Sequence, residues 1–127
     1  MPYQFTKHYT LSEAVRLLPK LRGWLDELSN LRATELEAEI ILSRLLSKSD
    51  DVGGETVNQS LRNLTRMKAI LSEFHRREIQ IKDIDRGLID FPAFYEDREV
   101  FFCWEKEEQT ITHWHDIEAG FGGRRPI

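Results

Sequence analysis

The hydrophobic pattern of the first part of the chain is helical. Between Leu17 and Leu45, nonpolar residues recur at alternating spacings of four and three, and only Glu35 interrupts them. This heptad pattern is typical of a helix that packs along a partner. At a rise of about 1.5 Å per residue, such a helix is roughly 40 Å long. A single helix cannot bury this seam, so the rest of the chain or a second copy must cover it.

The start of this helix is marked by a capping box. Thr10 and Glu13 are spaced so that each side chain can bond the other's backbone N–H, which predicts a helix beginning here. Pro19 lies eight residues beyond Leu11. Proline has no backbone N–H and crowds the preceding turn. The sequence therefore predicts either a kink just before Pro19 or a short first helix, with Pro19 opening the long one.

A second helical run follows a clear break. Residues 47–54 are rich in turn formers and end in a glycine pair. Nonpolar residues then recur every three or four positions from Val57 to Phe74, which predicts a helix from about Glu55 to about Gln80. Two long helices joined by a short connection lie antiparallel. Residues 10–80 are thus predicted to form a helical hairpin close to a two-stranded antiparallel coiled coil.

The pattern changes to β-type alternation after Gln80. Alternating or β-rich segments at 81–85, 88–91, 98–104 and 110–115 are separated by turn residues, which predicts a small antiparallel meander of about three strands. The tail from Gly120 is expected to be irregular. The predicted fold class is α+β, a single domain over 1–127. The meander and tail (81–127) pack against one end of the hairpin (10–80).

Composition narrows the function classes. The 127 residues carry a formal charge of −4, with 40% hydrophobic and 31% charged residues. An acidic balance argues against a general nucleic-acid binder. The sequence has neither a membrane-spanning apolar run nor a signal-peptide pattern at its start, so a cytoplasmic protein without membrane association is expected. A single cysteine, Cys103, excludes an internal disulfide.

The heptad seam also predicts self-association. A homodimer of two hairpins would bury both seams in a four-helix arrangement with two-fold symmetry. The residues expected to contribute are Leu21, Trp24, Leu28, Leu31, Leu42 and Leu45.

Reactive side chains gather in the C-terminal quarter. His113 and His115 are two apart in one predicted strand, and Cys103 lies in the strand before it. Thiolate, imidazole and carboxylate are ligands of zinc and similar divalent ions. A metal site formed by Asp90, Cys103, His115 and Glu118 is one interpretation. Two others remain open: Cys103 as a nucleophile with His115 as its base, or a buried cysteine with histidines that are only hydrogen-bonded.

The tail offers a candidate anion site. Gly123 could present a backbone N–H, and Arg124 a guanidinium fork, to a phosphate or carboxylate. The alternative is that the glycines let the tail lie flat while the arginines pair with nearby acids such as Asp116 or Glu118.

Several strings along nearly the whole chain resemble one protein family. They are Thr10-Leu11-Ser12-Glu13-Ala14, Leu17-Leu18-Pro19, Gly53-Gly54, residues 86–93 (Arg-Gly-Leu-Ile-Asp-Phe-Pro-Ala), Cys103-Trp104, Trp114-His115 and the terminal Gly120-Phe121-x-Gly123-Arg124-x-Pro126-Ile127. The chain resembles the domain of unknown function 2203 family of small prokaryotic proteins. The resemblance implies no activity. It directs attention to Asp90, Cys103, Trp114, His115, Gly120, Gly123 and Arg124. His113 is outside the family pattern. The resemblance therefore favours a site of His115 with carboxylates over a two-histidine site.

Two functions follow as hypotheses. The first is a self-associating helical interaction or assembly module without catalytic activity. The second is a metal- or anion-binding domain, or a small metal-dependent enzyme, with its site in the C-terminal β region.

Overall fold

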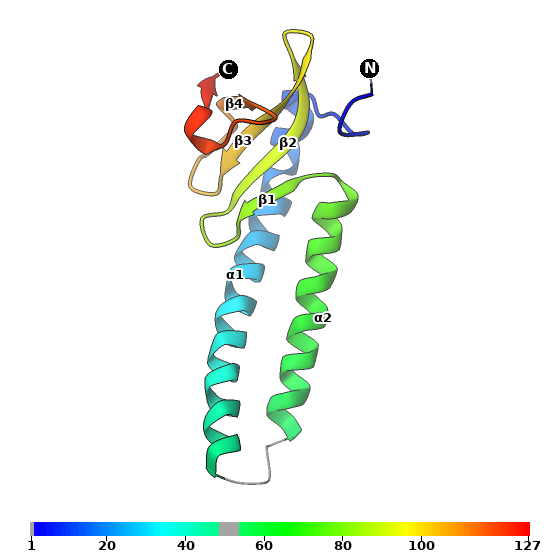
Figure 1. The fold of residues 1–127 in the computed structure, drawn as a ribbon. Coiled ribbons are helices and arrows are strands. Elements are labelled where there is room, and N and C mark those ends of the chain that lie inside the picture. Colours follow the sequence, from blue (N-terminus) through cyan, green and yellow to red (C-terminus); the bar gives the residue numbers. More distant parts are fainter. Residues whose placement is uncertain (1, 49–53) are drawn as a thin grey trace.

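Two long helices lie side by side in the computed structural model, which describes residues 2–48 and 54–127, without the side chains of residues 42 and 45–48. Helix α1 spans Leu11–Lys48 and helix α2 spans Gly54–Arg76. The two run antiparallel (Figure 1). The predicted break lies between them, and its central residues 49–53 are outside the described residues.

Contacts between the helices confirm this direction. The rings of Trp24 and Phe74 are 5.9 Å apart. Farther along α1, Asn63 Nδ2 donates to Glu35 Oε1 at 3.2 Å. Increasing numbers on α1 therefore meet decreasing numbers on α2, as in a helical hairpin.

The helix ends match the sequence prediction in one case and differ in two. The capping box is confirmed: the Thr10 N–H donates to Glu13 Oε1 at 2.8 Å, and the Glu13 N–H donates to Thr10 Oγ1 at 3.1 Å. Pro19 lies inside α1, so the alternative in which it opens a second helix is wrong. Helix α2 ends at Arg76, before the predicted Gln80. The chain turns there because Glu78 has a positive φ of 58°, which no helical residue adopts.

A five-stranded antiparallel sheet follows the hairpin, which confirms the α+β class. Its strands are β1 (Gln80–Asp83), β2 (Leu88–Tyr95), β3 (Arg98–Glu105), β4 (His113–Asp116) and β5 (Arg125–Pro126), in that spatial order. About three strands were predicted. The tail is also more regular than expected, because it forms a 3₁₀ turn, η1 (Phe121–Gly123), before β5 pairs with β4.

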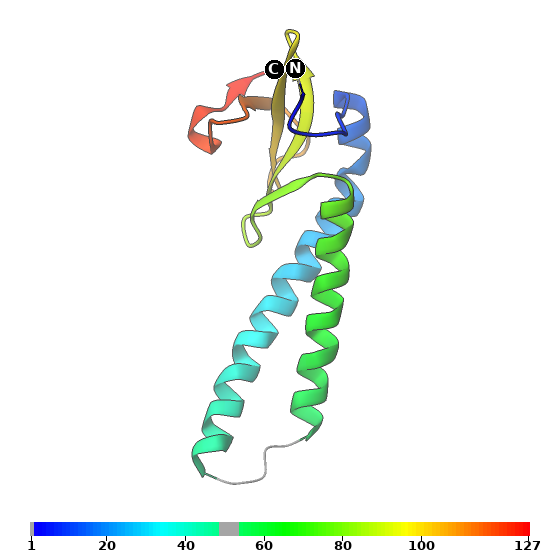
Figure 2. The same cartoon turned by 45° about the vertical axis from the view of Figure 1, so that its right-hand side comes forward.

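The sheet covers one end of the hairpin, as Figures 1 and 2 show. The buried core lies between this end and one face of the sheet. It includes Leu21 and Leu28 from α1 and Phe74 from α2, packed with Phe91 and Trp104 from the sheet. The described part of the sheet does not reach the other end of the hairpin (Figure 1). The exposed nonpolar side chains of that end include Leu36, Ile40, Ile41, Val57, Leu61 and Leu64.

Neither described helix could cross a membrane, since both are too polar for their length.

Candidate functional site

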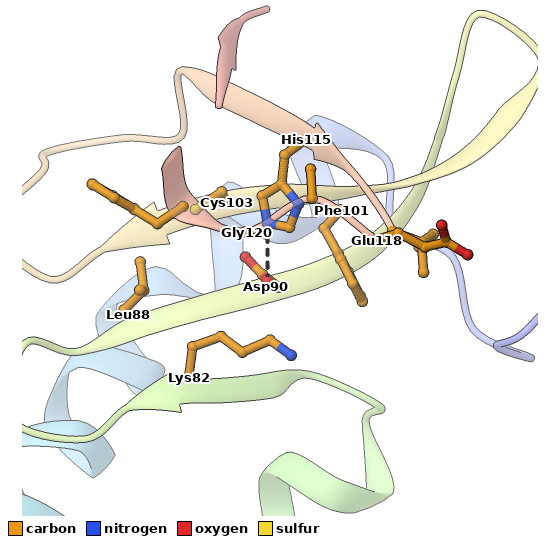
Figure 3. Close-up of a pocket in the computed structure, with 11 residues that line it drawn as sticks. Lys82, Leu88, Asp90, Phe101, Cys103, His115, Glu118 and Gly120 are labelled. Carbon is orange, nitrogen blue, oxygen red and sulfur yellow. Dashed lines mark ion pairs between the residues drawn. The ribbon is translucent and has the colours of Figure 1, made fainter. Parts of the chain in front are cut away.

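A pocket of about 350 Å³ opens on the sheet face that points away from the helices. It is lined by side chains of β1 to β4 and by the segment that follows β4. Figure 3 shows this lining, with Asp90, Cys103 and His115 grouped at its base. Pockets of this size are large enough for a small ligand.

Strand alternation places these three side chains on the pocket face. In β2, Ile89 and Phe91 belong to the core against the helices, so Asp90 between them points to the other side. Asp90 pairs directly with Cys103 of β3. His115 of β4 pairs with Phe101, which lies two residues before Cys103 on β3. Directly paired residues share a face of an antiparallel sheet, and so do residues two apart on one strand. The register therefore brings three distant residues together.

Asp90 and His115 form a buried pair. His115 Nε2 lies 3.0 Å from Asp90 Oδ2, and both side chains are 2% exposed. The other ring nitrogen, Nδ1, lies 2.8 Å from the backbone carbonyl oxygen of Asp116. Because a carbonyl only accepts, Nδ1–H must be the donor. The short contact between Nε2 and Oδ2 then requires one further proton between the two residues.

The pKa of His115 indicates where that proton resides. Burial alone would lower the pKa. The hydrogen bonds to Asp90 and to the Asp116 carbonyl, with the negative charge of Asp90, outweigh burial and raise it above its ordinary value of 6.5. This upward shift favours the imidazolium form, in which Nε2–H donates to the Asp90 carboxylate.

Cys103 is the third member of the cluster. Burial raises the pKa of its thiol to about 12, and the Asp90 carboxylate adds to this effect. A thiol with this pKa is protonated at neutral pH, and a nucleophilic cysteine requires the opposite shift. Both ring nitrogens of His115 are already engaged, so the geometry does not favour His115 as a base for Cys103.

The same arrangement suits a divalent metal. One ligand atom from each of Asp90, Cys103 and His115 lies within 4.8 Å of the other two. Asp90 Oδ1 is buried without a hydrogen-bond partner in the described chain. A buried carboxylate oxygen in this situation is costly unless a cation or donor meets it. The bond from Nδ1–H to a backbone carbonyl is also typical of metal-binding histidines, because it orients the ring and frees Nε2 for the ion.

The remaining predicted site residues lie outside this cluster. Glu118 lines the pocket, but its carboxylate points away from Asp90 (Figure 3). The N–H of Gly123 donates to the carbonyl of Gly120 at 2.9 Å, within the 3₁₀ turn. It is therefore not free for an anion.

Arg124 is also engaged within the chain. Its Nη2 donates to Glu108 Oε2 at 2.7 Å and to His113 Nδ1 at 2.9 Å. This agrees with the alternative in which the tail arginines pair with acids, although the partner is Glu108 rather than Asp116 or Glu118.

Most residues of the predicted self-association seam pack inside the single chain. Leu21 and Leu28 are fully buried, and Trp24 and Leu31 pack partly buried against the core. A second copy is therefore not needed to bury Leu21 and Leu28. The side chains of Leu42 and Leu45 are outside the described residues.

Lys82 is a pocket residue that the sequence reasoning missed. It lines the pocket from β1 at an irregularity of the ladder, where Ile81 pairs with Ile89 and Asp83 with Leu88. Lys82 is the extra residue of this bulge. Ile81 packs against the core, so the alternation of Ile81 and Lys82 is a local signal that could have placed Lys82 on the opposite face of the sheet.

The chain belongs to the family described as "Uncharacterized conserved protein (DUF2203)", which it matches over residues 7–127. This agrees with the resemblance seen in the sequence. No curated protein matches the chain. No solved structure matches it either.

Proposed function

We propose that this protein is a metal-binding domain whose centre is formed by Asp90, Cys103 and His115. The observation that carries the proposal is the convergence of three buried ligand atoms within 4.8 Å of one another at the base of a pocket. Oxygen, sulfur and nitrogen donors together suit zinc best among the common divalent ions.

Charge balance supports this assignment. A bound thiolate, a carboxylate and a neutral imidazole carry two negative charges, which a divalent ion neutralises. Without the ion, a protonated thiol and an imidazolium–carboxylate pair are also neutral overall. The buried site is thus electrically balanced in both states, as a low-dielectric environment requires.

Three protein ligands would leave a four-coordinate ion one position for water or substrate. Structural zinc sites normally have four protein ligands, whereas catalytic zinc sites keep a position for water or substrate. The proposed centre is therefore of the catalytic type, and a small metal-dependent enzyme is the activity it would support.

Elemental analysis of protein without a histidine tag tests the proposal. After zinc loading and dialysis, about one zinc per chain is expected, as for a single site. Cys103→Ser, close in size to the native residue, and His115→Ala should both lose it. His113→Ala is the matched control, because His113 lies on the same strand outside the cluster. Wild-type protein without zinc, or equal loss in the control, would overturn the assignment.

A second candidate function is self-association through the far part of the hairpin, in a cytoplasmic assembly module. It is supported by exposed nonpolar side chains on both helices, including Leu36 (56% exposed) and Leu61 (57%). Grouped apolar surface of this kind is typical of interaction sites. A second hairpin could bury it in a four-helix arrangement. Size-exclusion chromatography with light scattering tests this, and a clean monomer at micromolar concentration would contradict it.

A further inference from the structure

Lys82 lies on the pocket face of β1, because its neighbour Ile81 packs against the core on the other face. It is the extra residue of the β1 bulge, and bulges often re-aim side chains beside functional sites. Its ammonium lies 5.7 Å from the centroid of the Phe101 ring, which is also part of the pocket. Figure 3 shows the side chain extended below Asp90.

The ammonium of Lys82 makes no ion pair with any carboxylate of the described chain, although the neighbouring Asp83 is close in sequence. Other basic residues around the sheet do pair. Lys106 Nζ lies 2.8 Å from Asp26, and Arg86 Nε lies 2.8 Å from Glu105. Lys82 is thus a positive charge at the pocket that the chain leaves available.

The rest of the pocket is divided between polar base and nonpolar wall. Leu88, Phe101, Ile117 and Phe121 contribute apolar surface, while Asp90 and His115 lie at the base. With a divalent ion at the base the cluster is neutral, so Lys82 is the positive charge that an anion in the pocket would meet. The exposed Glu118 is the opposing charge on the lining, but its carboxylate points away from the base (Figure 3).

We infer that the pocket binds small organic carboxylates, with Lys82 as the residue that selects the anion. The carboxylate would lie near the Lys82 ammonium and the bound ion, and its nonpolar body would contact the nonpolar wall, which includes Leu88 and Phe101. This inference rests on the proposed metal centre. A carboxylate is favoured because one lysine matches one negative charge, and a pocket with apolar walls matches a nonpolar body.

Titration calorimetry with benzoate on zinc-loaded protein tests the inference. Benzoate is expected to bind, and Lys82→Gln should weaken it about tenfold or more, since a charge-assisted hydrogen bond is lost. Lys82→Arg should largely restore binding. Benzyl alcohol, which has the same ring without the charge, should bind about tenfold or more weakly than benzoate. Lys68→Gln, an exposed lysine on α2, is the matched control and should behave as wild type.

Zinc content measured on the same samples separates the two proposals. Lys82→Gln should retain full zinc, because Lys82 is not a ligand. Zinc binding together with benzoate affinity unchanged by Lys82→Gln, or with equal affinity for benzyl alcohol, overturns the inference alone. Absence of zinc from wild-type protein overturns the proposed function, and with it the metal contact to the carboxylate.

Discussion

At the centre of the sheet, both faces are buried, but they differ in chemistry. On the helix side, Ile89, Phe91 and Trp104 are fully buried among nonpolar side chains. On the pocket side, Asp90 and His115 are each only 2% exposed. Burial therefore does not distinguish the two faces. What distinguishes them is whether each buried polar atom has a partner.

On the helix side, the buried polar atom of Trp104 has its partner within the described residues. The indole N–H of Trp104 donates to the backbone oxygen of Glu108 at 2.9 Å. The pocket side leaves Asp90 Oδ1 without a partner in the described chain. Natural cores rarely leave such atoms unpaired, so an orphaned carboxylate oxygen indicates a site rather than a core. Neighbouring residues of β2 thus pack in the nonpolar core on one face and line the pocket on the other.

The largest expected effect belongs to the helix side. Trp104→Ala should lower the free energy of unfolding by about 3–5 kcal/mol, because it removes a large fully buried ring and leaves a cavity. Urea denaturation measures this loss. Glu107→Ala, an exposed neighbour in the following turn, should change stability by less than about 0.5 kcal/mol. If Trp104→Ala lowered the free energy of unfolding only slightly, packing on the helix side would not be a main source of stability.

A smaller effect is expected on the pocket side without metal. Asp90→Ala leaves the ring nitrogen of His115 buried without its partner, which should cost about 1–3 kcal/mol in the presence of a chelator. Urea denaturation with a chelator measures the stability lost in the variant, and urea denaturation with zinc measures the stability that the metal adds. Zinc should stabilise the wild type by mass action and leave Asp90→Ala unchanged. If zinc stabilises the variant equally, Asp90 is not a ligand.

The sequence predicts the helices well because their signals are local. The capping box and the nonpolar spacing lie within a few turns of one another, and the structure confirms the hairpin and the α+β class. The nonpolar spacing of α1 does not predict which part of the protein covers it. Leu21 and Leu28 are covered by α2 and the sheet, which is a tertiary outcome that spacing does not contain.

The sheet and the site were only partly predictable. Strands as short as β5, with two residues, carry too little alternation to be recognised. Asp90, Cys103 and His115 could be proposed from residue type and family resemblance, yet their convergence depends on the register of three strands. Alternation with Ile81 predicts the face of Lys82, but its place at the pocket depends on the pairing of β1 with β2, which is not a local property.

The Asp90–His115 pair should make the metal-free protein less stable at higher pH. The pKa of His115 is raised in the folded protein, so the stabilisation is fully present below the unfolded value near 6.5. It is lost as the pH rises through the folded pKa. The measurement is the difference in unfolding free energy between wild type and His115→Gln, with a chelator, from pH 5 to 9 in the range where both fold.

The affinity for zinc should have the opposite pH dependence. Zinc binding displaces the proton of the pair and that of the Cys103 thiol, whose pKa is about 12 without metal. Affinity should therefore rise with pH over the range in which metal-free stability falls. The control for the metal-free prediction is the unfolding free energy of wild type minus that of His115→Gln, measured with a chelator. If this difference grew with pH, His115 would not be an imidazolium in the folded protein.

The smallest effect on the single chain is expected far from the sheet. Leu61 on α2 is 57% exposed, so Leu61→Gln should change the unfolding free energy of dilute protein by less than about 0.5 kcal/mol. If the far part of the hairpin is an interface, the same substitution should shift the protein toward monomer at higher concentration, as light scattering would show. Leu11→Gln, at the exposed start of α1 near the sheet, is the control. Equal shifts in both variants would indicate general loss of hydrophobic surface, whereas a shift in Leu61→Gln alone would locate the interface on the part of the hairpin that the sheet leaves uncovered.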